Sequence, residues 1–253
     1  MREKYPDEND VTLRRFLVAR KYVLKDAITM RDDDLRYRRE ISPATDEELA
    51  VIIRMGTFYY HGRARDNTPI FITPVKNLDV KQMSIPQLQK MLIHNCDRVK
   101  RLCPESESFT CIVDLEGLSL FKNVNMSMLL ELVNLLNKCM PEVLCRVWIV
   151  NAPFVFRGIW SILSKAMDAH TIEKISFCTP SEYPSLHKFA SPENLPKKYG
   201  GTSNFDFNEK FWSRARPDFL LDGFDENMDD ESLEEQLAAL AEEEKRSSAS
   251  GST

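Results

Sequence analysis

The sequence predicts an α/β fold, a mixed and largely parallel β-sheet covered by helices, with a small α-helical annex at the N-terminus. The main observation is that strand-like and helix-like segments alternate between residues 57 and 189. Parallel strands need long crossover connections, so this alternation is typical of a parallel sheet. The second observation is size, because 253 residues with 43% hydrophobic side chains suffice for one substantial core.

The N-terminal segment, residues 1–55, is predicted to form the helical annex. Apolar side chains three to four positions apart indicate two helices, over residues 13–22 and 27–40. Asp10 lies where an N-cap of the first helix is expected. Both helices are densely basic, so the annex is a concentrated source of positive charge.

Two short β-rich runs follow the annex, over residues 57–62 and 69–75. They flank a turn-like sequence at 65–68, so we expect a hairpin or a strand pair. The next helix is predicted to begin at Ser84, because Ser84 and Gln87 have the spacing of a capping box.

The rest of the domain continues the alternation. The predicted order is strand and turn over 109–117, helix over 126–140, strand over 143–150, helix over 151–163, strand over 175–178 and a short helix over 183–189. The helix at 151–163, NAPFVFRGIWSIL, is unusual because it is apolar on more than one side. An ordinary helix buried in a large α/β core is one explanation of that pattern.

The charge of the chain is unevenly distributed. The formal net charge is −5, but residues 222–253 hold many acidic side chains and only two basic ones, which leaves the remainder mildly basic. A basic body suits contact with an anionic membrane surface. We predict three regions, namely the annex at 1–55, the α/β domain at 56–205, and a C-terminal extension at 206–253 with an acidic, largely disordered tail.

Several classes of enzyme are disfavoured. The sequence has no glycine-rich nucleotide motif and no G-x-S-x-G, and it has only 8 glycines. Its four histidines lack ligand spacing, so no metal site and no cofactor are expected. The cluster of His94, Cys96 and Asp97 is a weak nucleophile candidate, because residues two apart point to different faces of a helix. We expect no enzymatic activity and no nucleic-acid partner.

The predicted location is the cytoplasm. The six cysteines contain no C-x-x-C pair and lie mostly in apolar runs, so they are expected to be reduced core thiols. The first residues are charged throughout and do not resemble a signal peptide. The longest uncharged apolar run, 147–156, is half of the ~20 residues that a membrane-spanning helix needs.

Three stretches together resemble the CRAL-TRIO lipid-binding family, in particular its phosphatidylinositol-transfer branch. They are LRRFLVARKYVLKDA (13–27), VNAPFVFRGIWSILSKAMDAHTIEKI (150–175) and ENLPKKYGG (193–201). The likeness runs from about residue 10 to 205, and the order and spacing of the three motifs agree with the family. The sequence before the first motif is short by the standard of the family, so either the annex is reduced or the chain is a fragment.

The resemblance implies a pocket for one lipid, with the sheet as its floor, helices as its walls and a mobile gate helix around 153–167. Such a gate is apolar inward to cover acyl chains and apolar outward to enter a bilayer, which explains the two-sided pattern. The gate residues are Phe154, Phe156, Ile159, Trp160 and Leu163.

The resemblance also implies the residues that meet the lipid head group. They are Glu142 at the start of a strand, Thr171 and Lys174 before the next strand, and Arg20 and Lys21 in the annex. A carboxylate accepts hydrogen bonds from inositol hydroxyls, and the cations neutralise the phosphodiester. In the alternative interpretation, Glu142 and Lys174 are solvated charges at strand ends, and Arg20 pairs with Asp33 or Asp34.

Departures from the branch bear on the ligand. Val143 stands where the branch often has Arg, which removes one possible phosphate contact. The expected pocket residues on the strands are Tyr60, Phe71, Phe109 and Cys111. At the last three positions, the resemblance implies that relatives that also carry phosphatidylcholine use hydroxyl groups. Thr110 is expected on the opposite face, because strand side chains alternate. A less polar second ligand, such as a sterol or another isoprenoid, is therefore a live alternative.

The leading hypothesis is a non-enzymatic protein, peripheral to membranes, that binds phosphatidylinositol and transfers it between them. The first alternative is a carrier of another small hydrophobic ligand on the same fold. The second is a lipid-sensing interaction module whose pocket is vestigial and whose acidic tail recruits a partner.

Overall fold

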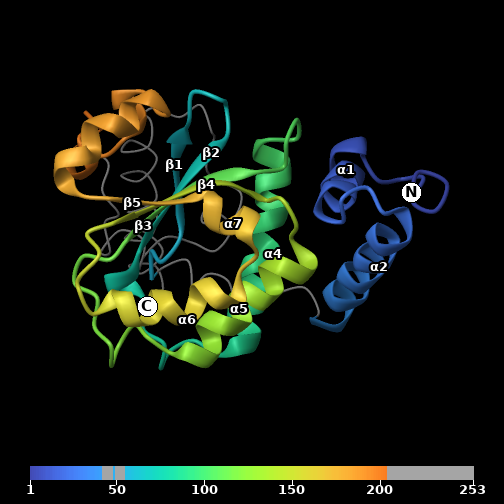
Figure 1. Ribbon diagram of the computed structural model, residues 1–253, viewed down its shortest axis with the longest axis horizontal. Helices are drawn as coiled ribbons and strands as arrows, with labels where there is room; N and C mark the ends of the chain where they lie inside the picture. Colours follow the sequence, from blue (N-terminus) through green and yellow to red (C-terminus); the bar gives the residue numbers. More distant parts are fainter. Residues whose placement is uncertain (42–47, 49–54, 204–253) are drawn as a thin grey trace, which may run out of the picture.

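The computed structural model describes residues 1–41, 48 and 55–203, and the predicted tail lies outside them. The described chain contains a five-stranded sheet in the order β1-β2-β3-β4-β5 (Figure 1). The strands are β1 (Tyr59–Arg63), β2 (Pro69–Pro74), β3 (Phe109–Asp114), β4 (Leu144–Val150) and β5 (Ile175–Cys178). β1 is antiparallel to β2 and all other pairs are parallel, so the predicted fold class is confirmed.

The helices follow the predicted alternation. They are α1 (Asp10–Ala19), α2 (Leu24–Ile41), α4 (Ile85–Leu102), α5 (Met126–Cys139), α6 (Phe156–Ala166) and α7 (Ala169–Glu173). Short 3-10 helices are Val75–Asn77, Pro180–Lys188, Pro192–Asn194 and Lys197–Tyr199. The predicted capping box is present, since the side chains and backbones of Ser84 and Gln87 bond reciprocally.

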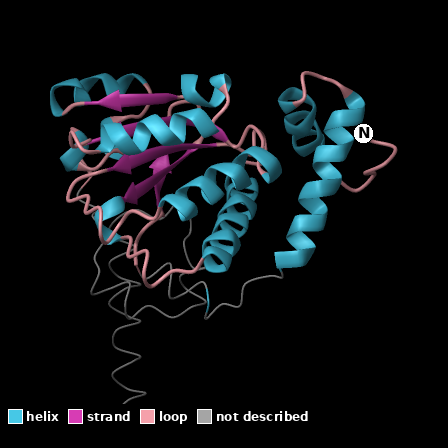
Figure 2. Ribbon diagram, turned by 60° about the horizontal axis from the view of Figure 1, so that its bottom comes forward, coloured by secondary structure: helices cyan, strands magenta, loops and turns pink. Residues whose placement is uncertain are grey.

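The sheet is covered on both faces (Figure 2). One face packs against α4, α5 and α6 through a cluster that includes Phe71, Cys111, Val147 and Ile149. The other face packs against the 3-10 helices through Ile70, Ile72, Ile112 and Trp148. The two clusters take alternate residues of each strand, as the two-residue period of a strand requires. Central parallel strands are therefore apolar on both sides.

Three local predictions were wrong in detail. Asn9 rather than Asp10 caps α1, because the Asn9 side chain accepts the Thr12 N–H at 2.6 Å. The first helix spans 10–19 rather than 13–22. It ends there because Lys21 and Tyr22 both adopt positive φ, which turns the chain directly into α2. The segment predicted as a short helix at 183–189 is the 3-10 helix Pro180–Lys188.

The hairpin turn matches its prediction. β1 and β2 pair antiparallel, with Tyr60 opposite Phe71. Asn67 adopts a φ of 65°, the left-handed conformation that asparagine tolerates better than most residues. The turn therefore forms without a glycine at that position.

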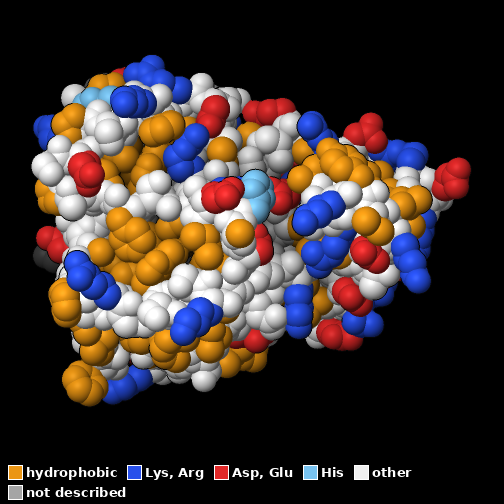
Figure 3. Space-filling model, viewed as in Figure 1, with side chains coloured by type: hydrophobic (Ala, Val, Ile, Leu, Met, Phe, Trp, Pro, Cys, Tyr) orange, Lys and Arg blue, Asp and Glu red, His pale blue; other side chains and the backbone are white. Residues whose placement is uncertain are grey.

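The annex, α1 and α2, lies to one side of the sheet and its covering helices (Figures 1 and 2), and Lys and Arg side chains are spread over the face seen in Figure 3. α2 reaches the domain through Arg38, whose Nη1 donates to Asp97 of α4 at 2.9 Å. Tyr37 packs against the core cluster under the sheet. These contacts attach α2 of the annex to α4 and to the core cluster.

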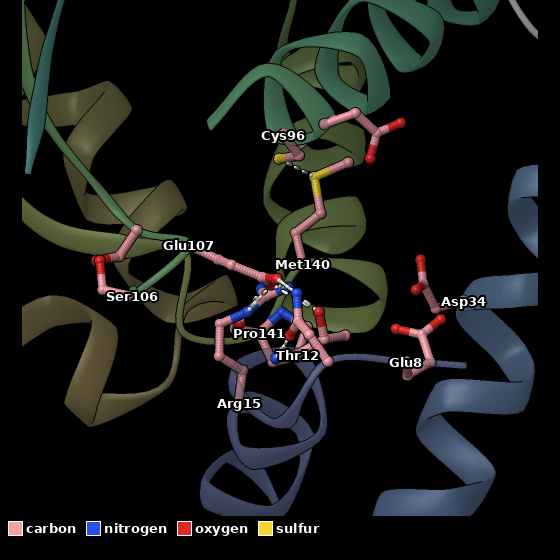
Figure 4. Close-up of polar contacts among 12 residues, drawn as sticks. Glu8, Thr12, Arg15, Asp34, Cys96, Ser106, Glu107, Met140 and Pro141 are labelled. Atoms are coloured by element: carbon pink, nitrogen blue, oxygen red, sulfur yellow. Dashed lines mark hydrogen bonds and ion pairs between the residues drawn. The ribbon is translucent and has the colours of Figure 1, made fainter. Parts of the chain in front are cut away.

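A buried ion pair joins α1 to the domain (Figure 4). Arg15 Nε donates to Glu107 Oε2 at 3.0 Å, and Arg15 Nη2 lies 2.7 Å from the same oxygen. The side chain of Arg15 is 9% exposed and that of Glu107 is 0% exposed. Glu107 also accepts from Thr12 Oγ1 at 2.7 Å and from Asn9 Nδ2 at 2.7 Å. The remaining Arg15 nitrogen, Nη1, donates to the Pro141 carbonyl at 2.9 Å. One arginine thus connects the annex to two separate loops.

Replacing Glu107 by Gln is predicted to destabilise the protein by about 3–5 kcal/mol, because Arg15 keeps its buried charge without a counter-charge. Chemical denaturation measures the loss. The matched control is Asp33→Asn, which breaks the exposed pair with Arg36 and should cost about 1 kcal/mol or less. Equal, small effects of both variants would contradict the assignment.

The same pair predicts an acid-sensitive component of stability. Burial raises the pKa of Glu107, but hydrogen bonds from Thr12 and Asn9 and the charge of Arg15 outweigh it, so the pKa lies below its ordinary value of 4.5. Because the pKa is lower in the folded protein than in the unfolded protein, ionised Glu107 contributes its full stabilisation above the unfolded pKa. That stabilisation is lost as the pH falls through the folded pKa. Glu107→Gln should lack this component in acid titrations followed by circular dichroism.

Candidate functional site

A pocket of about 460 Å³ lies between the end of α1, the loop before β4 and helix α7. All five predicted head-group residues line it, namely Arg20, Lys21, Glu142, Thr171 and Lys174. They come from three segments that are far apart in the sequence. The structure therefore brings together the residues that the resemblance singled out.

Glu142 and Lys174 form the pair at the centre of the pocket. Lys174 Nζ donates to Glu142 Oε2 at 2.8 Å, and both side chains are mostly buried. Glu142 has a φ of 59°, a conformation that turns the chain between α5 and β4. The two charges are therefore paired with each other and mostly buried rather than fully solvated.

Thr171 is fixed by the cap of α7. The side chain of Asp168 accepts from the Thr171 backbone N–H and from its hydroxyl, both at 2.8 Å. Burial raises the pKa of Asp168, but these hydrogen bonds outweigh it and the pKa lies below its ordinary value. The cap consequently stays ionised, and the Thr171 oxygen keeps its lone pairs for another donor.

Arg20 and Lys21 line the pocket from the annex side. Arg20 is the C-cap of α1, and Lys21 starts the left-handed turn that follows. The alternative pairing of Arg20 with Asp33 or Asp34 does not occur. Asp33 binds Arg36, and Asp34 binds the two arginines Arg31 and Arg38.

His170 is a pocket residue that the sequence analysis missed. Its Nε2 lies 3.3 Å from Glu142 Oε2, the oxygen that also accepts from Lys174. Its Nδ1 lies 3.9 Å from Glu173 Oε2. The available signal was spacing, because His170 and Lys174 are four positions apart and such residues lie on one side of a helix.

The floor of the pocket is apolar and continuous with the main core. Its apolar lining includes Val133, Leu136, Met140, Val143, Leu144 and Ile175. The same six side chains belong to the cluster that packs between the sheet and helices α4, α5 and α6. The pocket is therefore charged at its mouth and apolar where it meets the core, as an amphipathic ligand requires.

The four strand residues predicted for the pocket share one face of the sheet, but they pack in the core cluster and none of them lines the pocket described above. Tyr60, Phe71, Phe109 and Cys111 all belong to the cluster under α6. The rings of Phe71 and Phe109 lie 5.5 Å apart, edge to face. Thr110 points to the opposite face, as predicted, and its hydroxyl contacts Thr68 Oγ1 at 3.0 Å.

Helix α6 is apolar on two sides. Phe156, Ile159 and Leu163 are buried in the cluster on the sheet. Phe154, just before the helix, and Ile162 are exposed. Trp160 is half-buried and contacts the Phe177 ring edge to face at 5.2 Å. The helix thus has both apolar faces that the sequence indicated.

The chain enters α6 through a tethered residue. Asn151 has a φ of 54° and donates from Nδ2 to the buried Asp114 carboxylate at 2.8 Å. The Tyr183 hydroxyl donates to Asn151 Oδ1 at 2.9 Å, and the Tyr199 hydroxyl donates to Asp114 at 2.7 Å. Tyr199, from the third motif ENLPKKYGG, packs on the sheet face opposite α6. Through Asp114 it helps to hold Asn151, the residue at which the chain turns toward α6.

The weak nucleophile candidate gains no support from the structure. Cys96 is buried, and burial raises its pKa to about 12, so the thiol stays protonated. Asp97 binds Arg38. Within residues 1–41, 48 and 55–203, no group of three or more His, Cys, Asp or Glu side chains could hold a metal ion. None of the helices in this part of the chain is long and apolar enough to cross a membrane.

The fold is that of a lipid-binding domain. Residues 53–201 match the model of the CRAL/TRIO domain family, and the chain belongs to that family. It is therefore a member of a family of lipid-binding and lipid-transfer proteins with relatives of the SEC14 type.

Curated relatives and a solved structure agree. The chain is 26% identical to a CRAL-TRIO domain-containing protein of Saccharomyces cerevisiae over 81% of this chain and 74% of that one. It is 28% identical to the SEC14 cytosolic factor of Kluyveromyces lactis over 77% and 71% of the two chains. For Protein real-time of Drosophila melanogaster, at 28% identity, the match spans 75% of this chain but only 32% of that protein.

The crystal structure of Sfh5 has the same fold. It superposes with a TM-score of 0.61 at 16% identity, over 81% of this chain and 77% of that one. At this level of identity, the similarity concerns the fold alone.

Replacing Gly201 by Ala is predicted to destabilise the domain by about 3 kcal/mol or more, because backbone atoms cannot yield to the new side chain. A Cβ at Gly201 would lie 1.9 Å from the Leu195 carbonyl oxygen. The matched control is Gly158→Ala in α6, where no atom lies within 4 Å of the new Cβ. That substitution should stabilise by about 0.5–1 kcal/mol. Urea denaturation of both variants checks the contrast, and a Gly201→Ala protein as stable as the wild type would contradict it.

Proposed function

We propose that this protein binds phosphatidylinositol, one molecule per pocket, and transfers it between membranes without catalysing a reaction. The observation that carries the proposal is the amphipathic pocket beside α7. Its polar side holds three cations and two carboxylates, and its floor is apolar and continuous with the core under α6. A phosphodiester offers these cations a partner of opposite charge, which a neutral hydrophobic ligand does not.

The head group is assigned to the charged end. Lys174, Arg20 and Lys21 neutralise the phosphodiester, because ammonium and guanidinium groups are its natural partners. Glu142 accepts hydrogen bonds from inositol hydroxyls, which a carboxylate does well. Thr171 offers its oxygen to a further hydroxyl group. This division of roles explains why a carboxylate lies within a cluster of cations.

The acyl chains are assigned to the region between the sheet and α6, which apolar core side chains fill in this structure, so their entry requires α6 to move away from the sheet. Exposing two chains of ~30 methylene groups to water would cost more than ~20 kcal/mol at ~0.8 kcal/mol each. A protein that offers a matching apolar cavity makes the exchange nearly neutral in free energy, and movement of α6 then sets the rate. The protein acts in the cytoplasm and visits membranes peripherally.

A second candidate function is transport of a less polar ligand, such as a sterol. The strand face under α6 favours it, because Phe71, Phe109 and Cys111 offer no hydroxyl group. The Cys111 thiol is buried, and burial raises its pKa to about 11, so it remains neutral. Identifying the lipid that purifies with the protein separates the two functions.

The test is lipid analysis of the purified protein by native mass spectrometry. We expect phosphatidylinositol in the wild type and its loss in the double variant Glu142→Ala with Lys174→Ala. Removing both partners avoids leaving one buried charge alone, so the double variant should remain folded. The matched control is Asp33→Ala with Arg36→Ala, an exposed pair on α2 that should leave the lipid content unchanged.

Two results would overturn parts of the proposal. Inositol lipid retained by the double variant would refute the head-group assignment. A sterol or another neutral lipid in the wild type would refute the choice of ligand. Removal of residues 222–253 should leave transfer intact, whereas for the interaction module it should abolish recruitment of a partner.

A further inference from the structure

Two apolar side chains project from the edge of the sheet where β3 and β4 end. Phe121, in the loop after β3, is 89% exposed, and Phe154, before α6, is 79% exposed. They are the most exposed large hydrophobic side chains among the described residues. Asp114 pairs with Val150 at the strand ends, and the Leu115 N–H donates to the Val150 carbonyl at 3.0 Å. The two loops therefore leave the sheet side by side (Figure 1, lower left).

The loop that carries Phe121 is held in a closed turn. The Ser119 N–H donates to Asn123 Oδ1 at 2.6 Å, and the Asn123 N–H donates to the Ser119 carbonyl at 2.8 Å. The buried Asn123 side chain also donates to the Leu78 carbonyl at 2.5 Å. Phe121 is thus presented to solvent by an ordered turn, although burying a phenylalanine would stabilise the fold.

Exposed cations lie beside both aromatic side chains. Lys122 follows Phe121 directly and its Nζ donates to the Lys76 carbonyl at 3.4 Å, and Arg157 lies beside Phe154. The Arg157 guanidinium lies 4.8 Å from the centre of the Phe154 ring. The acidic residue of the loop, Glu116, lies 3.8 Å from Lys76. Figure 3 shows hydrophobic side chains interspersed with Lys and Arg over this lower left part of the molecule.

We propose that the loop at residues 118–122 is a fixed membrane anchor, which inserts Phe121 into the interface of a bilayer that contains anionic lipids. The inference rests on the proposed function, because lipid transfer requires a bilayer encounter. Exposed phenylalanine side chains can insert between lipid head groups, and the cations beside them are attracted to anionic lipids. Protein interfaces, in contrast, are depleted of lysine. The loop is tied to the sheet, so it stays in place while α6 moves.

The test measures partition onto vesicles of phosphatidylcholine, with and without phosphatidylserine, by sedimentation. Phe121→Ala should weaken binding to the anionic vesicles about tenfold, which is the loss expected when one aromatic side chain no longer enters the interface. Lys122→Glu should weaken binding to the anionic vesicles alone. The control is Leu130→Ala, an exposed residue on α5, which should bind as the wild type does.

A double variant separates the anchor from the gate. Phe121→Ala and Phe154→Ala should each weaken binding, and their effects should multiply because the two tips enter the bilayer independently. Wild-type vesicle binding by Phe121→Ala would overturn the anchor, as would a double variant no weaker than Phe154→Ala alone. If Phe121→Ala instead abolished self-association and left vesicle binding unchanged, the patch would be a protein interface and the inference would fail.

The lipid content of the same variants keeps this test apart from the proposed function. Phe121 lies outside the pocket, so Phe121→Ala should retain the lipid that purifies with the wild type, as native mass spectrometry would show. Weakened vesicle binding with an unexpected lipid in the pocket would refute the proposed ligand and support the anchor. Unchanged vesicle binding with phosphatidylinositol in the pocket would support the proposed ligand and refute the anchor.

Discussion

The arrangement of the pocket depends on the buried pair of Arg15 and Glu107. Arg15 also donates to the Pro141 carbonyl, and Pro141 immediately precedes Glu142. One side chain therefore fixes both the annex, which supplies Arg20 and Lys21, and the loop that supplies Glu142. A buried ion pair is weak support for overall stability, because desolvation offsets much of its attraction. The pair matters here because it fixes the position of the annex relative to the loop before β4, and both segments line the pocket.

Two of the pocket charges, Glu142 and Lys174, form a pair with each other. Lys174 and His170 both contact the same oxygen of Glu142. An arriving phosphodiester would take Lys174 as its partner, and inositol hydroxyls would replace Lys174 at Glu142. Head-group binding is then an exchange of partners, which avoids leaving a buried charge without a counter-charge. Such an exchange suits a carrier, because it makes both binding and release possible without a large barrier.

Periodicity predicted most of the fold, because strands and helices bury their residues at fixed spacings. The same rule placed Cys111 on the core face and Thr110 on the other. Rules based on local sequence did not predict the contacts that depend on residues far apart in the chain. Glu107 lies in a loop with no periodic signal, and its partner Arg15 is 92 positions away. The residues proposed to bind the head group were identified through a family resemblance, and His170 was missed because that resemblance did not include it.

Helix α6 connects the two regions on which the proposed transfer depends. Its entry at Asn151 is tied to Asp114 and Tyr183 at the edge of the sheet, beside the loop of Phe121. Its far end runs into Met167 and Asp168, which line the charged pocket. Any displacement of α6 about a fixed Asn151 therefore moves the wall of the head-group site. Because Asp168 also holds Thr171, the proposed function would make uncovering the acyl chains and loosening the head group parts of the same movement.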